Sequence, residues 1–226
     1  ANVLRSILRQ DPDVIMVGEI RDLETAKIAT QAALTGHLVL STLHTNNACG
    51  AVTRLMDMGM ENYLVTASLV GVVAQRLVRK NCLQCSAAYR LAEEERLFFQ
   101  QFFHKVPPEK LSKGSGCKYC NQTGYRGRIS IQELLVLNQE LKGLILNGAT
   151  AEMLQVKAVE QGMVPLISDG LRCLEAGITT VDEVVRTVFS SVFDAEASGY
   201  AESTAFTAQL QKRGKRDFAI DFPEKN

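Results

Sequence analysis

Four of the six cysteines form two Cys-x-x-Cys pairs whose spacing is typical of a metal site. The pairs are Cys82 with Cys85 and Cys117 with Cys120. Two thiolates that flank a tight turn can both bind one tetrahedral ion, and two such pairs complete a closed structural zinc site. The sequence therefore predicts a Zn2+ ion bound by all four sulfurs. Two disulfides or a redox-active pair are the alternatives, and both need a compartment or a context that nothing else in the sequence supports.

The segment between the two pairs is longer than in a simple zinc ribbon. It has 31 residues, so we expect an inserted subdomain. Part of the insert is typical of a helix, in which phenylalanines recur at helical spacing: Phe98, Phe99, Phe102 and Phe103. We expect these rings to pack within the cysteine module, and a membrane or partner face is the alternative. Around the second pair, small residues such as Gly124 allow backbone amides to turn toward the sulfurs.

Two short apolar segments, residues 14–17 and 38–42, have the character of strands buried on both faces of a parallel sheet. Between them, Asp22 is a suitable N-cap for a helix over residues 23–34, and Gly36 ends that helix. A strand, a helix and a strand joined by short loops form a right-handed βαβ unit. The sequence thus predicts an α/β fold with a parallel sheet.

Polar residues follow each of these strands at its carboxyl end, where open α/β sheets bind ligands. Glu19 and Arg21 come after the first strand, and His44 comes after the second. In a nucleotide hydrolase, a carboxylate so placed orients or deprotonates the attacking water or helps to hold Mg2+, and a histidine can contact a γ-phosphate. A salt bridge between Glu19 and Arg21 and an ordinary loop histidine are the alternatives. His37 is a weaker candidate for the same site.

Further elements are expected along the rest of the chain. Helices are predicted near residues 47–58 and 62–79, and residues 129–136 are typical of a short strand that runs into a helix. Three or four short helices fill residues 139–189, where Thr150 can cap one of them. The region after the cysteine module is therefore expected to be largely helical.

The last part of the chain changes character. Thr180 and Glu183 have the spacing of a capping box, ahead of an apolar stripe at helical spacing. Residues 190–226 are instead rich in Ser, Ala and charged side chains. We expect them to form a weakly ordered tail.

Composition limits the classes of partner. Lys plus Arg and Asp plus Glu both number 25 in 226 residues, so the formal charge is zero. This balance excludes a long-range basic field of the kind that attracts nucleic acid. No run of about 18 apolar residues is present, so no membrane-spanning helix is expected. The chain begins at Ala1 rather than at Met, and we expect it to be part of a longer protein.

Several stretches together resemble the secretion ATPases of the GspE/PilB type, which drive type II secretion and type IV pilus assembly. Residues 8–22 are similar to that family's Walker B region, and residues 35–46 resemble its histidine box. Residues 74–78, followed by the four cysteines, resemble its zinc-bearing C-terminal module, and residues 124–128 also fit. The resemblance covers roughly residues 1–189. The four cysteines favour the assembly and secretion branch over the retraction ATPases.

The resemblance implies a fold and a division into domains. The fold would be α/β, the C-terminal half of a RecA-like P-loop ATPase core with a tetracysteine zinc module and a small helical C-terminal domain. Residues 1–80 would belong to the ATPase core, 81–128 to the zinc module and 129–189 to the helical domain. Residues 190–226 would be the flexible tail.

The resemblance also implies a mechanism. Glu19 would be the Walker B catalytic glutamate, His44 would sense the γ-phosphate, and Arg21 and His37 would support nucleotide binding. ATP and Mg2+ would be bound in the complete protein, at the subunit interfaces of a homo-hexamer. Hydrolysis would power pilus or pseudopilus assembly, or protein secretion. A zinc-stabilised docking or regulatory module without its own ATPase activity is the alternative.

The resemblance further implies partners and a location. The hexamer would work with the inner-membrane platform and assembly proteins of its machine, in the cytoplasm and peripheral to the inner membrane. It would bind no nucleic acid. One feature departs from the family, because no P-loop of the form G-x-x-x-x-G-K-[ST] occurs in these 226 residues. We therefore expect the isolated chain neither to bind ATP tightly nor to hydrolyse it.

Overall fold

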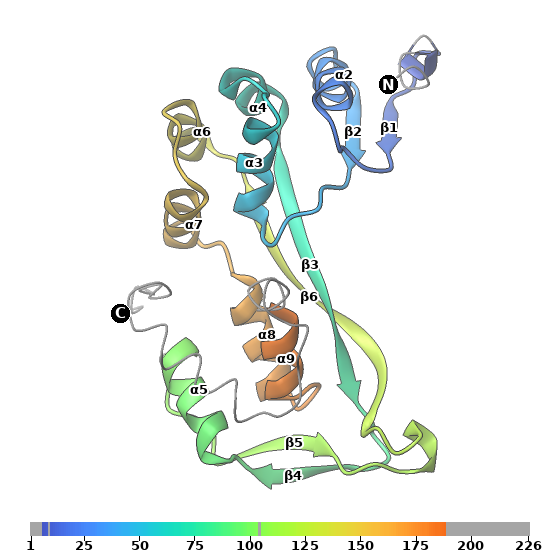
Figure 1. Ribbon diagram of the computed structural model, residues 1–226, viewed down its shortest axis with the longest axis vertical. Coiled ribbons are helices and arrows are strands. Elements are labelled where there is room, and N and C mark those ends of the chain that lie inside the picture. Colours follow the sequence, from blue (N-terminus) through green and yellow to red (C-terminus); the bar gives the residue numbers. More distant parts are fainter. Residues whose placement is uncertain (1–5, 9, 104, 189–226) are drawn as a thin grey trace. The chain divides into compact units, whose positions relative to one another are not determined.

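The computed structural model describes residues 6–8, 10–103 and 105–188. The described residues form two compact units. Unit 1 comes from the segments Ala1–Ala74 and Glu133–Met163, and unit 2 comes from Gln75–Gln132 and Val164–Asn226. The predicted tail at 190–226 lies outside the described residues. Figure 1 labels the helices and strands of both units.

Unit 1 contains the predicted βαβ unit. Strand β1 (Val14–Val17), helix α2 (Leu23–Leu34) and strand β2 (Leu38–Ser41) follow one another, and β1 pairs with β2 in parallel (Figure 1). Asp22 caps α2, because its carboxylate accepts the backbone N–H of Thr25 at 2.8 Å. The backbone of Gly36 has a φ of +100°, which lets the chain leave the helix and enter β2. The prediction for these three elements is confirmed.

The predicted burial of both sheet faces is wrong for this chain. Ile15 packs with Ile28 of α2 on one face of the sheet. On the opposite face, Met16 is 78% exposed, and Leu40 is 50% exposed. Helix α2 covers a single face, and no other described element covers the second one. The apolar character of both strands is therefore correct, but within the described residues it does not lead to two-sided burial.

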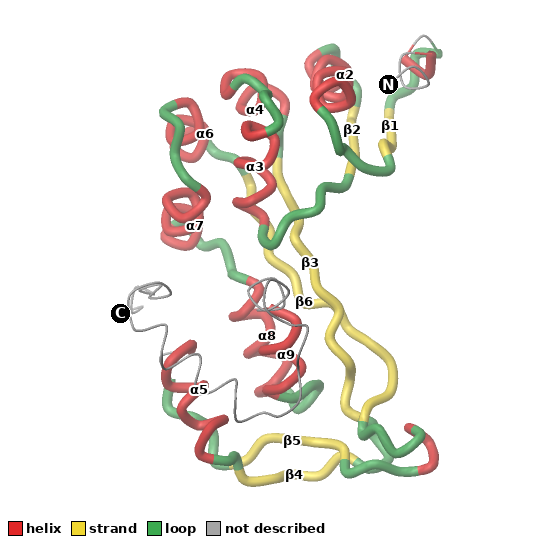
Figure 2. Tube along the Cα trace, viewed as in Figure 1, coloured by secondary structure: helices red, strands yellow, loops and turns green. Residues whose placement is uncertain are grey.

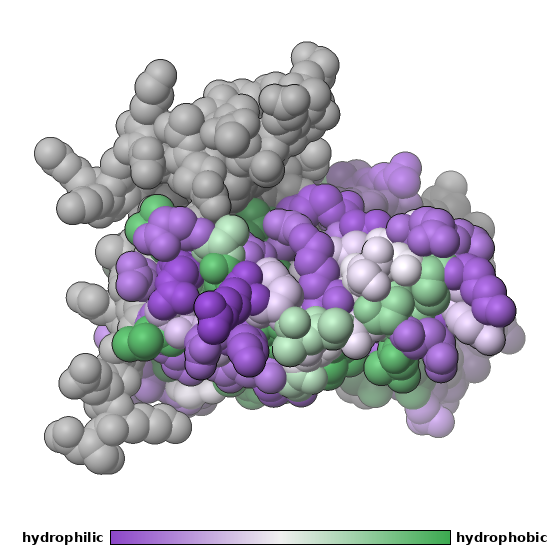
Figure 3. Space-filling view, turned by 90° about the horizontal axis from the view of Figure 1, so that it is seen from below, coloured by the Kyte–Doolittle hydropathy of each residue, from purple (hydrophilic) through white to green (hydrophobic). Residues whose placement is uncertain are grey.

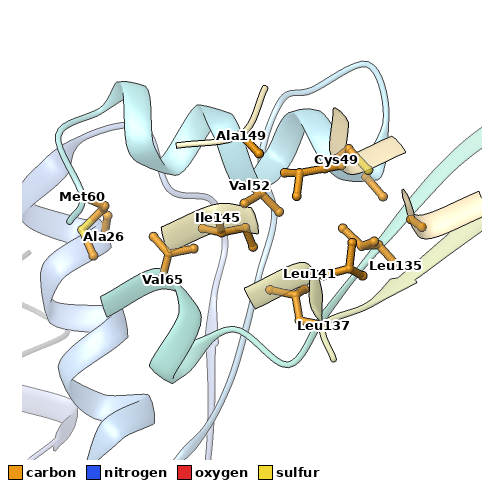
Figure 4. Packing of buried hydrophobic residues seen from close by; sticks show 13 residues of the cluster. Ala26, Cys49, Val52, Met60, Val65, Leu135, Leu137, Leu141, Ile145 and Ala149 are labelled. Atoms are coloured by element: carbon orange, nitrogen blue, oxygen red, sulfur yellow. The ribbon is translucent and has the colours of Figure 1, made fainter. Parts of the chain in front are cut away.

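The larger core of unit 1 lies between five helices and the paired ends of two strands (Figure 4). The helices are α2, which contributes Ala26, together with α3 (Ala48–Asp57), α4 (Asn62–Ser68), α6 (Gln139–Leu146) and α7 (Ala151–Glu160). In Figure 4, Val52 of α3, Val65 of α4 and Ile145 of α6 point toward one another. Each is at most 1% exposed. As predicted, the hydroxyl of Thr150 accepts from the backbone of α7, at Met153 N.

Two long strands replace a predicted helix and extend a predicted strand. Residues 71–79 were expected to continue a helix, but they lie in β3 (Gly71–Asn81), which pairs with β6 (Tyr125–Val136) (Figure 2). Side chains along β3 alternate in exposure, with Val73 and Leu77 outside and Val78 buried. A run of Val, Leu and Ala does not distinguish a buried helix from a strand. Residues 71–79 form a strand because β6, which is distant in sequence, pairs with them and supplies the other half of the β ladder.

Unit 2 contains the cysteine module and a helical pair. Strands β4 (Ser86–Arg90) and β5 (Lys110–Gly114) are antiparallel, and α5 (Glu93–Phe103) lies between them in sequence. A 3-10 turn, η1 (Lys118–Cys120), precedes β6. Helices α8 (Leu166–Glu175) and α9 (Val181–Val188) pack against each other. The side of unit 2 that carries β4 and β5 presents mostly hydrophilic side chains with smaller hydrophobic areas between them (Figure 3).

The core of unit 2 joins α5 to the α8–α9 pair. Phe99 and Phe103 are buried there with Leu111 of β5 and with Leu174 and Val184. The two rings are therefore buried inside the protein, but packing within the predicted module at 81–128 is only part of the arrangement. The cluster includes Leu91 and Leu111 of the module and, in larger number, residues of α8 and α9. The side chains of Phe98 and Phe102 lie outside the described residues.

The capping box predicted at α9 takes a different form. The hydroxyl of Thr180 accepts the backbone N–H of Glu183 at 3.4 Å, which is the expected half of the motif. The carboxylate of Glu183 instead accepts the backbone N–H of Arg79 on β3 at 2.9 Å and binds the Arg79 guanidinium. In a capping box, the Glu183 carboxylate would bond to the backbone N–H of Thr180. Here the carboxylate, which is 1% exposed, bonds to Arg79 of β3 instead.

Candidate functional site

The ends of β1 and β2 are tied together where the candidate polar residues begin. The hydroxyl of Thr42 donates to the carbonyl of Gly18 at 2.6 Å, and the N–H of Ile20 donates to the carbonyl of Thr42 at 3.0 Å. These bonds continue the parallel pairing by one step past the strands. They bring the residues that follow each strand, Glu19 and His44, to the same edge of the sheet.

Glu19, Arg21 and His44 meet at this edge. One carboxylate oxygen of Glu19 lies 2.6 Å from Nε of Arg21 and 3.2 Å from Nε2 of His44. The side chain of Glu19 is 32% exposed, whereas those of Arg21 and His44 are 73% and 88% exposed. The adjacent guanidinium of Arg21 lowers the pKa of Glu19, and the contact with His44 lowers it further against the opposing effect of desolvation.

This arrangement has a definite chemical capacity. A carboxylate with a lowered pKa stays ionised at neutral pH, so it can accept a hydrogen bond from water or bind a cation. The exposed imidazole beside it can donate to an anion that arrives from solvent. The three side chains thus form an accessible site. In it, the Arg21 guanidinium and the His44 imidazole both lie within hydrogen-bonding distance of the Glu19 carboxylate.

His37 is not brought into this cluster. It precedes β2, whereas His44 follows it, so the two histidines lie at opposite ends of one strand. Nδ1 of His37 lies 3.0 Å from the carbonyl oxygen of Ala32 and 3.2 Å from the hydroxyl of Thr35. These contacts close the C-terminal end of α2. A nucleotide-binding role for His37 stays a prediction.

A further acidic residue near the loop of His44 was missed from the sequence. Glu133 on β6 is 3% exposed, and its Oε1 accepts the backbone N–H of Ala48 at 2.6 Å. Ala48 opens α3, the helix that follows the His44 loop. The only sequence signal is the alternation along β6, in which Glu133 shares its face with the buried Ile131 and Leu135.

The four predicted cysteine ligands converge in unit 2. Their sulfur atoms all lie within 4.8 Å of one another. The Sγ atoms of Cys82 and Cys117 are 3.9 Å apart, as are those of Cys85 and Cys120, and those of Cys117 and Cys120 are 3.7 Å apart. A tetrahedral Zn2+ with sulfur ligands at about 2.3 Å would place these sulfurs about 3.8 Å apart. The observed cluster fits that ligand set.

Backbone amides point at the sulfur of Cys120, as the small residues around it predict. The N–H groups of Cys117 and Gly124 donate to this sulfur at 3.2 and 3.3 Å. Desolvation opposes ionisation, but these N–H groups, together with the thiols of Cys117 and Cys85, lower the pKa of the Cys120 thiol to about 6. A thiolate is the form that binds a metal.

Close backbone packing explains the glycines of the knuckle. A side chain at Gly114 would put its Cβ 2.0 Å from the carbonyl oxygen of Gly124, so neither position has room for one. The two other cysteines, Cys49 and Cys173, are free and buried at 0% exposure. Their burial agrees with the expectation that they act as apolar core residues.

The fold and the cysteine cluster define the class of protein. The arrangement is α/β and corresponds to the C-terminal half of a RecA-like ATPase core that carries a tetracysteine cluster. A crystal structure of the pilus retraction motor PilT with bound ADP is similar to this chain, with a TM-score of 0.56 and 28% sequence identity. The similarity covers 82% of this chain and 42% of that one.

The particular family follows from the sequence comparison. Residues 1–186 match the model of the type II/IV secretion system protein family, and the chain belongs to this family. The type II secretion system ATPase E of Vibrio cholerae is 52% identical over 186 residues, which are 82% of this chain and 36% of that protein. The type IV pilus assembly ATPase PilB of Myxococcus xanthus is 50% identical over 190 residues, or 82% and 33%.

The chain thus spans about a third of the length of these relatives. The family assignment made from the Walker B, histidine-box and cysteine stretches is confirmed. Within the described residues, no helix has the length and apolarity needed to cross a membrane.

Proposed function

We propose that this chain is the part of a secretion or pilus-assembly ATPase that activates the attacking water and senses the γ-phosphate. The observation that carries the proposal is the 3.2 Å approach of Glu19 to His44 at the shared edge of β1 and β2. Ligands of open α/β sheets bind at this edge. A module used only for docking would have no need of an acid and a histidine held together there.

Glu19 acts as the base or orienting group. Its lowered pKa keeps the side chain a carboxylate, which accepts a proton or a hydrogen bond from the attacking water or helps to hold Mg2+. In the structure, Nε of Arg21 lies 2.6 Å from one carboxylate oxygen of Glu19. Arg21 therefore restrains the carboxylate until nucleotide is bound, and then supports either the site or the contact with a neighbouring subunit.

His44 reports the presence of the γ-phosphate. Its ring is 88% exposed and is anchored to the protein through the contact with Glu19. An anionic phosphate would compete with Glu19 for the Nε2 proton, so nucleotide binding changes the partner of both side chains. This exchange gives a physical link between the state of the nucleotide and the position of the catalytic acid.

The chain lacks a P-loop, so the β- and γ-phosphates would be held by residues outside these 226. ATP and Mg2+ would bind in the complete protein, a homo-hexamer with nucleotide at its subunit interfaces. Relatives are named for type II secretion and for type IV pilus assembly. By analogy, the hexamer would work in the cytoplasm, against the inner-membrane platform of such a machine.

The cysteine cluster has a structural role in this proposal. Zn2+ bound by Cys82, Cys85, Cys117 and Cys120 would hold together the end of β3, the start of β4 and the turn that precedes β6. The sulfur distances of 3.7–3.9 Å and the N–H donors to Cys120 support four thiolate ligands. A site closed by four protein ligands leaves no position for a substrate, so the metal would take no part in hydrolysis.

The proposal is tested by ATP turnover of the complete protein with His44→Ala, and with Glu24→Gln as the control. Removal of a group that contacts the γ-phosphate in the transition state should lower kcat roughly 10²- to 10³-fold. Because Glu24 lies exposed in the first turn of α2 and has no assigned role in the site, its replacement should change kcat less than about threefold. Equal losses in both variants would reject the assigned role of His44. The isolated 226-residue chain is expected to show no turnover.

A further inference from the structure

Glu133 is a buried acid that the proposed mechanism does not use. It lies on β6 and is 3% exposed, and a carboxylate so deep in a protein requires polar partners. Its Oε1 accepts the backbone N–H of Ala48 at 2.6 Å, across 85 residues of sequence. This bond is therefore a tertiary contact between β6 and the first residue of α3, within unit 1.

Two side chains hold this end of α3. The side chain of Asn47 accepts the N–H of Gly50 at 2.7 Å, which is the local N-cap. Glu133 accepts the N–H of Ala48, which the local cap leaves without a helical partner. A negative charge is also favourable at the positive end of a helix dipole. Ala48 and Cys49 are fully buried, so this helix end is fixed in the core.

The loop that carries His44 runs between two fixed points. It leaves β2 at Thr42, which is bonded to Gly18 by its hydroxyl at 2.6 Å. It enters α3 at Asn47 and Ala48, where the second anchor is Glu133. The hydroxyl of Thr45 bonds to the carbonyl of Asn47 at 3.2 Å, so the loop is also braced against its own end. The position of His44 therefore depends on both anchors.

We propose that Glu133 is a positioning residue that sets the place of His44 relative to Glu19 by holding the start of α3. It touches neither of them and acts through the backbone of Ala48. Its relevance to hydrolysis rests on the proposed function, but its effect on His44 does not. The conservative variant Glu133→Gln keeps an oxygen that can accept the Ala48 N–H. Glu133→Met keeps a similar length and removes the acceptor.

The chain offers an internal control for the test. It contains three histidines, at positions 37, 44 and 104. His37 and His44 lie at opposite ends of β2 in the same unit, and His37 is bonded to α2 rather than to the α3 loop. Carbon–proton NMR spectra of the imidazole rings in the 226-residue chain therefore report on both ends of the strand, once the signals are assigned through His37→Gln and His44→Gln.

Glu133→Met is expected to shift the His44 ring signals by more than their line width and to leave the His37 signals in place. Glu133→Gln should return the His44 signals close to their original positions. An unmoved His44 in a folded Glu133→Met chain would overturn the proposal, as would equal shifts of both histidines. If Glu133→Met does not fold, the same histidine signals are compared in Glu133→Gln and in Asn47→Ala. Asn47→Ala removes the local cap at the start of α3. A shift of His37 rather than of His44 in those variants would also overturn it.

Turnover of the complete protein separates this proposal from the proposed function. Displacement of His44 should lower kcat roughly 10- to 100-fold in Glu133→Met, with a change in KM for ATP below about twofold. If the His44 signals move but His44→Ala leaves turnover intact, the positioning role stands and the proposed function fails. If His44→Ala abolishes turnover but the signals and kcat of Glu133→Met do not change, the proposed function stands and the positioning role fails.

Discussion

The carboxylate of Glu183 on α9 accepts the backbone N–H of Arg79 on β3 at 2.9 Å and also binds the Arg79 guanidinium. Arg186, one turn further along α9, bonds to the same carboxylate at 3.0 Å. The acid is 1% exposed, and the Arg79 side chain lies over the ring of Tyr125 at 4.2 Å. This pair therefore fastens the last described helix of unit 2 to its long strand.

The Glu183 contacts make the stability of unit 2 sensitive to acid. Desolvation opposes ionisation, but the hydrogen bonds from Arg79 lower the pKa of Glu183 below its ordinary value of 4.5. The stabilisation is thus complete above that value and is lost as pH falls through the lowered pKa of the folded protein. Chemical denaturation of the chain between pH 3 and 7 should show this loss, with Glu183→Gln less stable than wild type by roughly 1–3 kcal/mol at pH 7.

Glu140 provides the control for this acid effect. It also has a lowered pKa, through its hydrogen bond with Lys157, but its side chain is 64% exposed. Because solvent screens such pairs, Glu140→Gln should cost less than about 1 kcal/mol. A stability profile that is flat below pH 4.5 in wild type, or equal losses in both variants, would contradict the role assigned to Glu183.

Metal removal should selectively destabilise unit 2. Chelation removes the ion that would join the two knuckles, and Cys82→Ser removes one of its four ligands. The energy of metal binding is part of the folding energy of such modules. We expect the melting transition of unit 2 to fall by more than about 10 °C, with about one zinc per chain before treatment and none after it. Elemental analysis by inductively coupled plasma measures the zinc directly.

Cys173 is the matched control for the metal prediction. It is buried at 0% exposure in the same unit but lies outside the cysteine cluster. Cys173→Ala should retain one zinc per chain and lose only the stability of a small buried side chain. Zinc-free wild-type protein, prepared without a chelator, would show that the four sulfurs serve another purpose.

Close packing of α8 on α9 makes one glycine essential. A Cβ added at Gly170 would lie 2.7 Å from a methyl carbon of Val184, which is itself fully buried. Gly170→Ala should therefore push the two helices apart and cost about 1–3 kcal/mol. In α6, a Cβ at Gly143 would meet nothing within 4 Å, so Gly143→Ala should stabilise by about 0.5–1 kcal/mol through helix propensity. Thermal melts of the two variants should move in opposite directions, and parallel shifts would contradict the described packing.

Local signals were sufficient for part of the fold and of the candidate site. Asp22 as a cap, Gly36 as a stop and two apolar strands each depend on neighbours within a few residues, and all three are found. The convergence of Glu19 and His44 was predictable because parallel strands place their carboxyl ends at one edge. The cysteine cluster was predictable because four sulfurs at that spacing satisfy one tetrahedral ion.

Contacts between distant segments were not predictable in the same way. The sequence alone predicts a helix where β3 lies, because the strand that pairs with it, β6, begins 44 residues after β3 ends. Glu133 and Glu183 resemble ordinary polar residues in sequence, since only the tertiary structure buries them and supplies the N–H groups of Ala48 and Arg79. The contacts of His37 were not predictable either, because it lies near His44 in sequence but at the opposite end of β2 in the structure.

The most direct test of the account is the ATP turnover of the complete protein with Glu19→Gln. Loss of the catalytic carboxylate should lower kcat about 10²- to 10⁴-fold and leave the affinity for ATP within about threefold. Glu24→Gln, which changes an exposed acid in the first turn of α2, should retain near-normal turnover. Turnover by Glu19→Gln within twofold of wild type would contradict the account, because the acid at the end of β1 would then take no part in hydrolysis.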